Sequence, residues 1–292
     1  MKFLCLVLLG VTISCTPKSQ APQAYREWQQ KKAEAYRETF SNPAIVRSQY
    51  LKDSEKVYLE SNSQPLKISK GVCNGFCSWS VEFKDGKIIL QGLNDSSLKE
   101  YKLDEPPLKV NESIFFEGAK VDKHQVRVFF YDLSQKNLAK KRQRYFFDYQ
   151  KKWVFQGIYH AFSKQKVIKF GRSDGSSKDY LALGEIRWSG EGGEQQLTLL
   201  HFDAQAPIPE DQRQVMLMFR DTSNGKQTYG AGRFLVVDLP SPLNQLKSGE
   251  LVTLDFNFAY NPPCAVSAGF HCPLPQDTMD FAIEAGEKYQ KL

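Results

Sequence analysis

Short stretches that alternate apolar and polar residues make up most of this chain, a pattern typical of β-strands with one buried face. From about residue 45 onward, these stretches are separated by turn sequences rich in Gly, Asp, Asn and Ser. One of them, Asp85-Gly86, predicts a tight hairpin, because these residues tolerate the positive φ angles that such a turn needs. No helix-length periodic segment interrupts the pattern. The sequence therefore predicts a mainly β fold, an antiparallel sandwich or barrel-like body.

The middle of the chain carries the clearest strand signals, because Phe, Tyr, Val and Ile are concentrated there and favour extended backbone. A basic loop and Gly-rich turns separate these runs. We predict strands at residues 126–131, 144–149, 167–171, 180–188 and 196–202. We place a boundary at Trp153, which divides the body into a first β-rich part, residues 44–152, and a C-terminal β-rich part, residues 153–292.

One segment near the N-terminus has the composition of a helix. Residues 25–43 are rich in Glu, Lys, Gln, Arg and Ala, which are good helix formers, and Asn42-Pro43 ends the segment. Its aromatic residues fall roughly on one stripe: Tyr25, Trp28, Tyr36 and Phe40. We expect this N-terminal helix to pack its stripe against the β body.

The first residues have the features of a bacterial export signal. The apolar run at residues 3–13 is too short to cross a bilayer as a permanent helix, and it suits a secretory signal. It ends at Ser14-Cys15, and a small residue before a Cys resembles the lipobox of bacterial lipoproteins, although Thr12 replaces the usual Leu. We predict a signal peptide at residues 1–14 and a lipid on Cys15. The alternative is a plain signal peptide with an incidental Cys.

Residues 15–24 are rich in Pro, Gln and Ser and have no apolar pattern, so we predict that they form a tether. The tether would hold the body at a bacterial membrane, on its periplasmic face or at the cell surface. The formal charge of +6 comes from 39 basic and 33 acidic residues spread along the chain. This is weak evidence for nucleic acid and fits an anionic membrane equally well. We expect a cell-envelope protein whose partner is the membrane and not nucleic acid.

Beyond the tether, four cysteines form two local pairs, Cys73 with Cys77 and Cys264 with Cys272. Exported proteins meet oxidising conditions, so we predict a disulfide in each pair. The alternatives are free thiols and a zinc site. Zinc ribbons usually use spacers of about two residues, whereas the spacers here are three and seven residues. His271 precedes Cys272, but neighbours in an extended loop point apart, so we expect no Cys–His nucleophile, no metal site and no cofactor.

The strongest turn signal of the C-terminal part is Asn224-Gly225, which favours a two-residue hairpin turn. A hairpin centred there places Arg220 opposite Tyr229, and the alternation of side chains puts both on one face with Arg233. Two arginines on one face are suited to a carboxylate or a phosphate, because a guanidinium forms paired hydrogen bonds with such anions.

A second predicted strand leads into a rigid corner. Over residues 250–258 the apolar positions alternate and predict a buried face: Val252, Leu254, Phe256 and Phe258. Asp255 and Asn257 would then stand side by side on the opposite face. The strand runs into Tyr260-Asn261-Pro262-Pro263-Cys264, where two prolines fix the backbone. A rigid structural corner is the minimum role of this segment.

Three motifs of the C-terminal part, taken together, resemble the signatures of one known family. They are Asp221-Thr222-Ser223-Asn224-Gly225 with Thr228-Tyr229-Gly230-Ala231-Gly232-Arg233-Phe234-Leu235; Leu254-Asp255-Phe256-Asn257-Phe258-Ala259-Tyr260-Asn261-Pro262-Pro263-Cys264; and Cys272-Pro273-Leu274-Pro275 with Ile283-Glu284-Ala285-Gly286-Glu287-Lys288. On these residues the chain resembles the domain of unknown function 1684 family over residues 153–288. It departs from the family's Pro, Glu, Asn and Leu pattern at residues 276–280. The resemblance implies a bacterial, often exported protein of unassigned activity, and it implies no catalytic residue.

Two functions agree with these observations. We favour a binding or structural protein of the cell envelope, whose ligand is an unknown small molecule or an envelope polymer. The alternative is an envelope enzyme, hydrolase-like, with a polar pocket formed by Asp221, Tyr229, Arg233, Asp255, Asn257, Tyr260, Asn261 and Glu284. The enzyme requires these side chains to converge on one concave site with an unpaired carboxylate. If Arg233 instead pairs with Asp221 or Glu284 in a filled core, the enzyme hypothesis fails.

Overall fold

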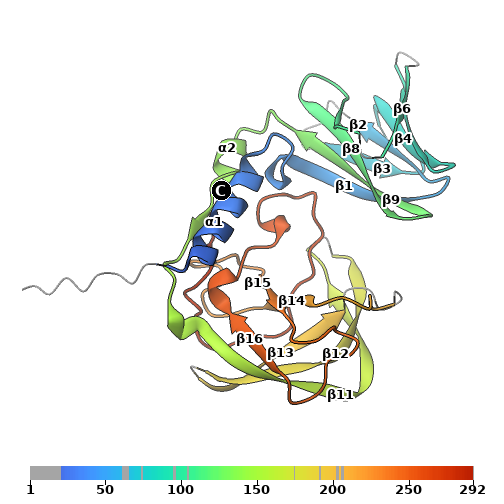
Figure 1. Ribbon diagram of the computed structural model, residues 1–292. Helices are drawn as coiled ribbons and strands as arrows, with labels where there is room; N and C mark the ends of the chain where they lie inside the picture. The colour runs from blue at the N-terminus through green and yellow to red at the C-terminus, as the bar shows by residue number, and fades with distance from the viewer. Residues whose placement is uncertain are drawn as a thin grey trace, which may run out of the picture.

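Two β-rich lobes, with helix α1 (Gln23–Arg37) beside both, make up the computed structural model of the protein (Figure 1). The structure describes residues 21–60, 66–73, 75–94, 97–103, 105–173, 175–190, 192–201, 204 and 207–291. The predicted signal peptide at residues 1–14 and the predicted lipidation site Cys15 lie outside the described residues. In the described part, no helix has both the length and the apolar character needed to cross a membrane. The strands pair antiparallel, which confirms the mainly β fold with an N-terminal helix.

In the first lobe, residues 45–132, one sheet packs against another over a common apolar core. One sheet has the order β1-β9-β8-β7: β1 (Ile45–Lys52), β9 (Gln125–Asp132), β8 (Ile114–Asp122) and β7 (Leu108–Lys109). The other has the order β3-β2-β4-β5-β6: β3 (Lys67–Lys70), β2 (Lys56–Glu60), β4 (Trp79–Lys84), β5 (Lys87–Gly92) and β6 (Leu98–Tyr101). Leu51, Leu90 and Phe130 contribute to this core from both sheets. Asp85 and Gly86 have φ of 51° and 75° between β4 and β5, which confirms the predicted hairpin.

In the second lobe, a sheet of long strands has the order β13-β12-β11-β16: β13 (Gly193–His201), β12 (Ser177–Gly190), β11 (Val154–Gly171) and β16 (Leu251–Asp255). The pair β14 (Gln214–Phe219) and β15 (Arg233–Asp238) packs on this sheet. Trp153, Phe219 and Leu254 are among the buried residues of the core between them. Val252 and Leu254 face that core, as their alternation with polar residues predicted.

The aromatic residues in and after helix α1 contact both lobes. Tyr25 is 1% exposed, and its ring centroid lies 5.6 Å from that of Phe258 in the second lobe. Just beyond the helix, the ring of Phe40 lies 5.0 Å from Phe115 and 5.4 Å from Tyr131 in the first lobe. These contacts confirm that the aromatic stripe packs on the body, and they tie the two lobes together on one side.

Short elements connect the lobes: η1 (Asn42–Ala44), α2 (Leu138–Lys141), β10 (Tyr145–Phe146) and η2 (Lys151–Trp153). Strand β10 pairs with β17 (Glu287–Lys288), so the end of the chain closes against this connection. The strand predicted at 144–149 is confined to the two residues of β10. At Phe147 the N–H donates to the Gly286 carbonyl at 2.9 Å, but the carbonyl accepts from the Tyr25 hydroxyl of α1 at 2.8 Å, so the strand pairing does not continue.

The register of β14 and β15 differs from the predicted hairpin. Phe219, the last residue of β14, lies opposite Arg233. Arg220 has left the pair, because its N–H and C=O bond to the backbone of residues 277–279, each at 2.9 Å. Arg220 therefore does not lie opposite Tyr229, and the predicted face shared by these residues and Arg233 was wrong.

The strand before the rigid corner is shorter than predicted. Strand β16 ends at Asp255, whose carboxylate accepts a hydrogen bond from the Asn257 N–H at 3.0 Å and so caps the 3₁₀ turn η3 (Phe256–Phe258). Phe256 is buried as predicted, but Asn257 is 0% exposed and does not stand on an open face. A second turn, η4 (Pro263–Ala265), follows and starts the loop that runs to Cys272.

Candidate functional site

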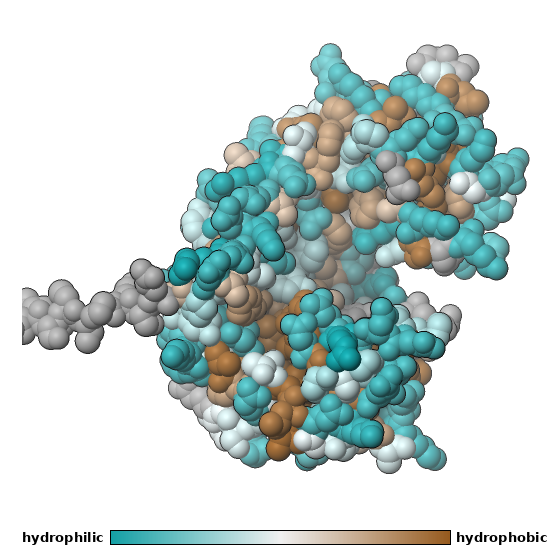
Figure 2. Space-filling view, viewed as in Figure 1, coloured by the Kyte–Doolittle hydropathy of each residue, from teal (hydrophilic) through white to brown (hydrophobic). Residues whose placement is uncertain are grey.

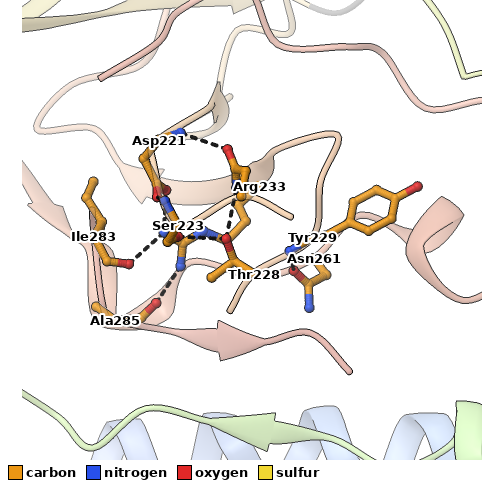
Figure 3. A network of polar contacts seen from close by, with 9 residues as sticks. Asp221, Ser223, Thr228, Tyr229, Arg233, Asn261, Ile283 and Ala285 are labelled. Carbon is orange, nitrogen blue, oxygen red and sulfur yellow. Dashed lines mark hydrogen bonds and ion pairs between the residues drawn. The ribbon is translucent and has the colours of Figure 1, made fainter. Parts of the chain in front are cut away.

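Arg233 and Asp221 form an ion pair inside the second lobe, and neither side chain is exposed (0% for both). Arg233 Nη2 donates to Asp221 Oδ2 at 2.6 Å and to the Ile283 carbonyl at 2.8 Å, and Nη1 donates to the Ala285 carbonyl at 2.5 Å (Figure 3). Burial lowers the pKa of Arg233, and the charge of Asp221 opposes that shift. This arrangement is the predicted alternative, in which the arginine pairs within the protein. Glu284 is exposed and takes no part.

The same ion pair organises the loop between β14 and β15. Asp221 Oδ1 accepts from the Ser223 N–H at 2.7 Å, and the Ser223 and Thr228 hydroxyls lie 2.7 Å apart (Figure 3). Asn224 donates to the Thr228 hydroxyl at 2.9 Å. These polar side chains bond to one another and to Arg233's partner, so they stabilise the loop rather than face a ligand.

The polar residues of the rigid corner are also used internally. Asn257 donates to the Gln150 carbonyl at 2.9 Å and to Asp255 Oδ1 at 2.8 Å. The end of the chain positions Asn261. Its N–H donates to Glu287 Oε2 at 2.8 Å, and its side chain donates to the Lys288 carbonyl at 3.0 Å.

The eight candidate residues therefore do not converge on one concave site. Asp221 is paired, Glu284 is exposed, and the amides of the corner hold backbone. Tyr229 and Tyr260 do line pockets, but two different ones. The Tyr260 pocket, about 320 Å³, also contains Lys32, whose Nζ lies 3.8 Å from the centre of the Tyr260 ring. Burial lowers the pKa of Lys32, and the negative charge of Glu287 opposes that shift.

The Tyr229 pocket lies between the two lobes, where the space-filling view shows a hollow in the surface (Figure 2). Its volume is about 450 Å³. It is lined by Arg47, Ser173, Tyr229, Cys264, Ser267, Ala268, Phe270 and His271. Arg47 belongs to β1 of the first lobe and the others to the second, so both lobes are needed to form it. Binding sites often lie at such junctions.

The loop that forms one wall of this pocket is fastened to strand β1. The Ser267 hydroxyl donates to the Ile45 carbonyl at 2.5 Å, and the Ser48 hydroxyl donates to the Gly269 carbonyl. Only glycine suits position 269, because a Cβ there would lie 2.5 Å from Ile45 Cγ2 and 3.0 Å from Arg47 N. The wall is therefore held in place by contacts that involve no sulfur atom.

The surroundings of the pocket are positively charged. Arg47 lines it, and among the described residues it forms no ion pair. Behind Phe270, the Arg127 guanidinium lies 5.1 Å from the ring centre and donates to the Ser48 hydroxyl at 2.9 Å. Burial lowers the pKa of Arg127, and the charge of Arg172 acts in the same direction. Since no described lining residue is Asp or Glu, this environment favours an anion.

The two predicted disulfides have different outcomes. Cys73 and Cys77 are bonded, with their Cα atoms 6.1 Å apart. Cys264 and Cys272 are instead free thiols in the structure, so the second predicted disulfide is not formed there. They are nevertheless neighbours, because the Cys264 N–H points at Cys272 Sγ at 3.3 Å. Among the described residues, no cluster of three or more His, Cys, Asp or Glu side chains is placed to hold a metal ion.

Cys264 lies close to Cys272, Tyr229 and Ser173. Bonds from the Cys272 thiol, and then from Tyr229 and Ser173, lower the pKa of Cys264, although its burial opposes the shift. The bond to Cys264 and burial raise the pKa of Cys272. The Tyr229 hydroxyl also donates to the Cys264 carbonyl at 3.3 Å. Negative charge is thus favoured on Cys264, the one of the two that lines the pocket.

Sequence reasoning found Tyr229, Cys264 and Cys272 but missed Arg47 and Ser173. The presence of His271 beside Cys272 was a signal, and His271 does line the pocket. Nothing in the sequence links Arg47 to this loop, because its position follows from how β1 meets the second lobe.

Comparison with known proteins gives a family but no activity. The family model described as "Protein of unknown function (DUF1684)" matches residues 118–288, which begins within β8, earlier than the resemblance expected from the motifs. No curated protein matches the chain. A similar solved structure is the NMR structure of the uncharacterized protein from gene locus rrnAC0354 of Haloarcula marismortui, at 26% identity and a TM-score of 0.43. The alignment covers 53% of this chain and 80% of that one.

Proposed function

The chain belongs to the DUF1684 family of proteins of unknown function, so its role has to be argued from its own site, and we propose that it is a binding protein of a bacterial cell envelope. It is anchored by a lipid on Cys15 and holds a small anionic molecule in the pocket between its lobes. The hydrolase alternative has lost its support, because Asp221 pairs with Arg233, Asn257 and Asn261 bond to backbone, and Glu284 is exposed away from them.

The observation that carries the proposal is the composition of the pocket. A cavity of about 450 Å³ accommodates a small organic molecule, and Arg47 brings to it a charge that no described carboxylate neutralises. Tyr229, Phe270 and His271 add ring surface, and Ser173 adds a hydroxyl. Hydrogen bonds from a guanidinium to a carboxylate or phosphate are among the stronger polar contacts in proteins.

The anchor is supported by the sequence alone. The short apolar run ends at Ser14-Cys15, and a tether without an apolar pattern follows. The mass of the mature N-terminus tests this part directly. A diacyl or triacyl adduct on Cys15 is expected, and an unmodified Cys15 in membrane fractions from the native host would refute the anchor.

The ligand class is tested with the purified mature chain and matched probes. Inorganic phosphate and succinate should raise its melting temperature, and dimethyl succinate, which is uncharged, should not. Arg47→Ala should weaken binding of the anions by about ten- to hundredfold, because a hydrogen bond to a charged group contributes about 1.5–3 kcal/mol. Arg37→Ala is the matched control, since Arg37 is exposed at the end of α1. Equal stabilisation by the neutral ester would refute an anionic ligand.

A further inference from the structure

Cys264 and Cys272 occupy unlike positions although they are neighbours. Cys264 is partly exposed and lines the pocket between the lobes, whereas Cys272 is 6% exposed and lies behind it. The Cys264 N–H donates to Cys272 Sγ at 3.3 Å, so the sulfur of Cys272 lies directly against Cys264. One thiol is thus open to a molecule in the pocket, whereas the other is largely buried beside it.

We propose that Cys264 and Cys272 form a redox-active dithiol that exchanges with a small anionic disulfide bound in the pocket, with Cys264 as the attacking and Cys272 as the resolving sulfur. The inference rests on the proposed binding pocket for the identity of its substrate, but the dithiol itself rests on the placement of the two cysteines.

The exchange proceeds in two displacements. The Cys264 thiolate attacks one sulfur of the bound disulfide, which forms a mixed disulfide and releases the other half of the substrate as a thiolate. Cys272 then loses its proton and attacks the Cys264 sulfur, which forms the Cys264–Cys272 disulfide and releases the second half. The protein is oxidised by two electrons and the substrate is reduced to two thiols. The reverse sequence oxidises two thiol molecules to a disulfide, so the direction depends on the thiol pool that the protein meets.

Its place in the pocket makes Cys264 the nucleophile of the pair. Cys264 is the one of the two that lines the pocket, and hydrogen bonding, chiefly with Cys272, lowers its pKa and favours its thiolate. The bond to Cys264 and burial raise the pKa of Cys272, which keeps the resolving sulfur protonated until the first displacement has consumed the Cys264 thiolate; the charge of Arg127 acts in the opposite direction. A thiolate in a partly exposed, electropositive pocket is the setting in which cysteines react.

The loop between the cysteines does not need a disulfide to keep its shape. Ser267 and Ser48 fasten it to β1, and Phe270 packs with Phe129 at a ring distance of 6.4 Å. Because these contacts are independent of the sulfur atoms, the loop can keep its place in both redox states.

The test uses the full mature chain carrying Cys15→Ser, Cys73→Ser and Cys77→Ser, so that only the proposed pair reacts. The reduced protein is mixed with glutathione disulfide, which is anionic, and the products are followed by mass spectrometry. We expect a Cys264–Cys272 disulfide and two released glutathiones. With Cys272→Ser the reaction should stop at a glutathione adduct on Cys264, and with Cys264→Ser it should be about tenfold slower or more.

Two further measurements separate the possible outcomes. Tyr229→Phe should slow the first displacement and raise the pH at which it is half-maximal, whereas Tyr260→Phe, a tyrosine that bonds to Met216 instead, should leave both unchanged. An oxidised pair that dithiothreitol reduces only in denaturant, or a Cys264→Ser variant that reacts as fast as the parent, would overturn the dithiol. If hydroxyethyl disulfide, which is neutral, reacts as fast as glutathione disulfide, the redox-active dithiol is supported and the preference of the pocket for an anion is refuted.

Discussion

The buried ion pair between Asp221 and Arg233 makes the sharpest prediction about stability. In Asp221→Ala, the Arg233 guanidinium keeps its burial (0% exposed) and its bonds to the Ile283 and Ala285 carbonyls, but loses its only described carboxylate partner. Removing one member of a buried pair typically costs about 3–5 kcal/mol, because the remaining charge stays desolvated without compensation. We therefore expect the free energy of unfolding to fall by about 3–5 kcal/mol.

The double variant Asp221→Ala with Arg233→Met tests the reason for this cost. It removes both charges, so the desolvation penalty disappears together with the attraction between them. The Ile283 and Ala285 carbonyls then lose their donors, at about 1–3 kcal/mol for each unsatisfied group. We expect the two single effects not to add, with a coupling of about 2–3 kcal/mol between the sites.

Guanidinium denaturation followed by tryptophan fluorescence measures these changes, because Trp153 and Trp188 lie in the core of the same lobe. Arg220→Met is the matched control: the residue lies beside Asp221 but is exposed, and surface changes usually stay within about 0.5 kcal/mol. A loss below about 1 kcal/mol in Asp221→Ala would show that the Arg233 charge is compensated without Asp221. Strict additivity in the double variant would show that the two residues do not stabilise each other.

Three further predictions follow from single contacts. Gly269→Ala should lower the free energy of unfolding by about 1–3 kcal/mol and loosen the pocket wall, because its Cβ would lie 2.5 Å from Ile45 Cγ2. Gly171→Ala is the control in the same thermal melts, because a Cβ at position 171 would have nothing within 4 Å. Phe256→Ala should lower the free energy of unfolding, measured by chemical denaturation, by about 3–5 kcal/mol, since this residue is 0% exposed in the core of the second lobe. The rate of Cys264 alkylation by iodoacetamide should reach half its maximum at a pH below that of a free cysteine, because its pKa is lowered; a midpoint above the free value would contradict the hydrogen bonds around the sulfur.

Local patterns predicted the elements of this protein well where the signal lay within a few neighbouring residues. The Asp85-Gly86 turn depends on the φ angles of those two residues, and it formed the hairpin predicted. The burial of Val252 and Leu254 follows from the alternation of side chains along one strand. The same reasoning failed at Asn224-Gly225, because backbone from residues 277–279 took the bonds that a hairpin partner would have made.

The sequence by itself determined the β class, the N-terminal helix with its aromatic stripe, and the burial of Val252, Leu254 and Phe256, because these depend on turn chemistry and on the period of apolar positions. Only the tertiary structure decided what the polar residues do. Whether Arg233 binds a ligand or Asp221 depends on which elements cover it, and the pocket between the lobes exists because Arg47 of β1 meets the loop of Cys264. Burial and charge pairing arise between segments far apart in the chain, so no local pattern records them.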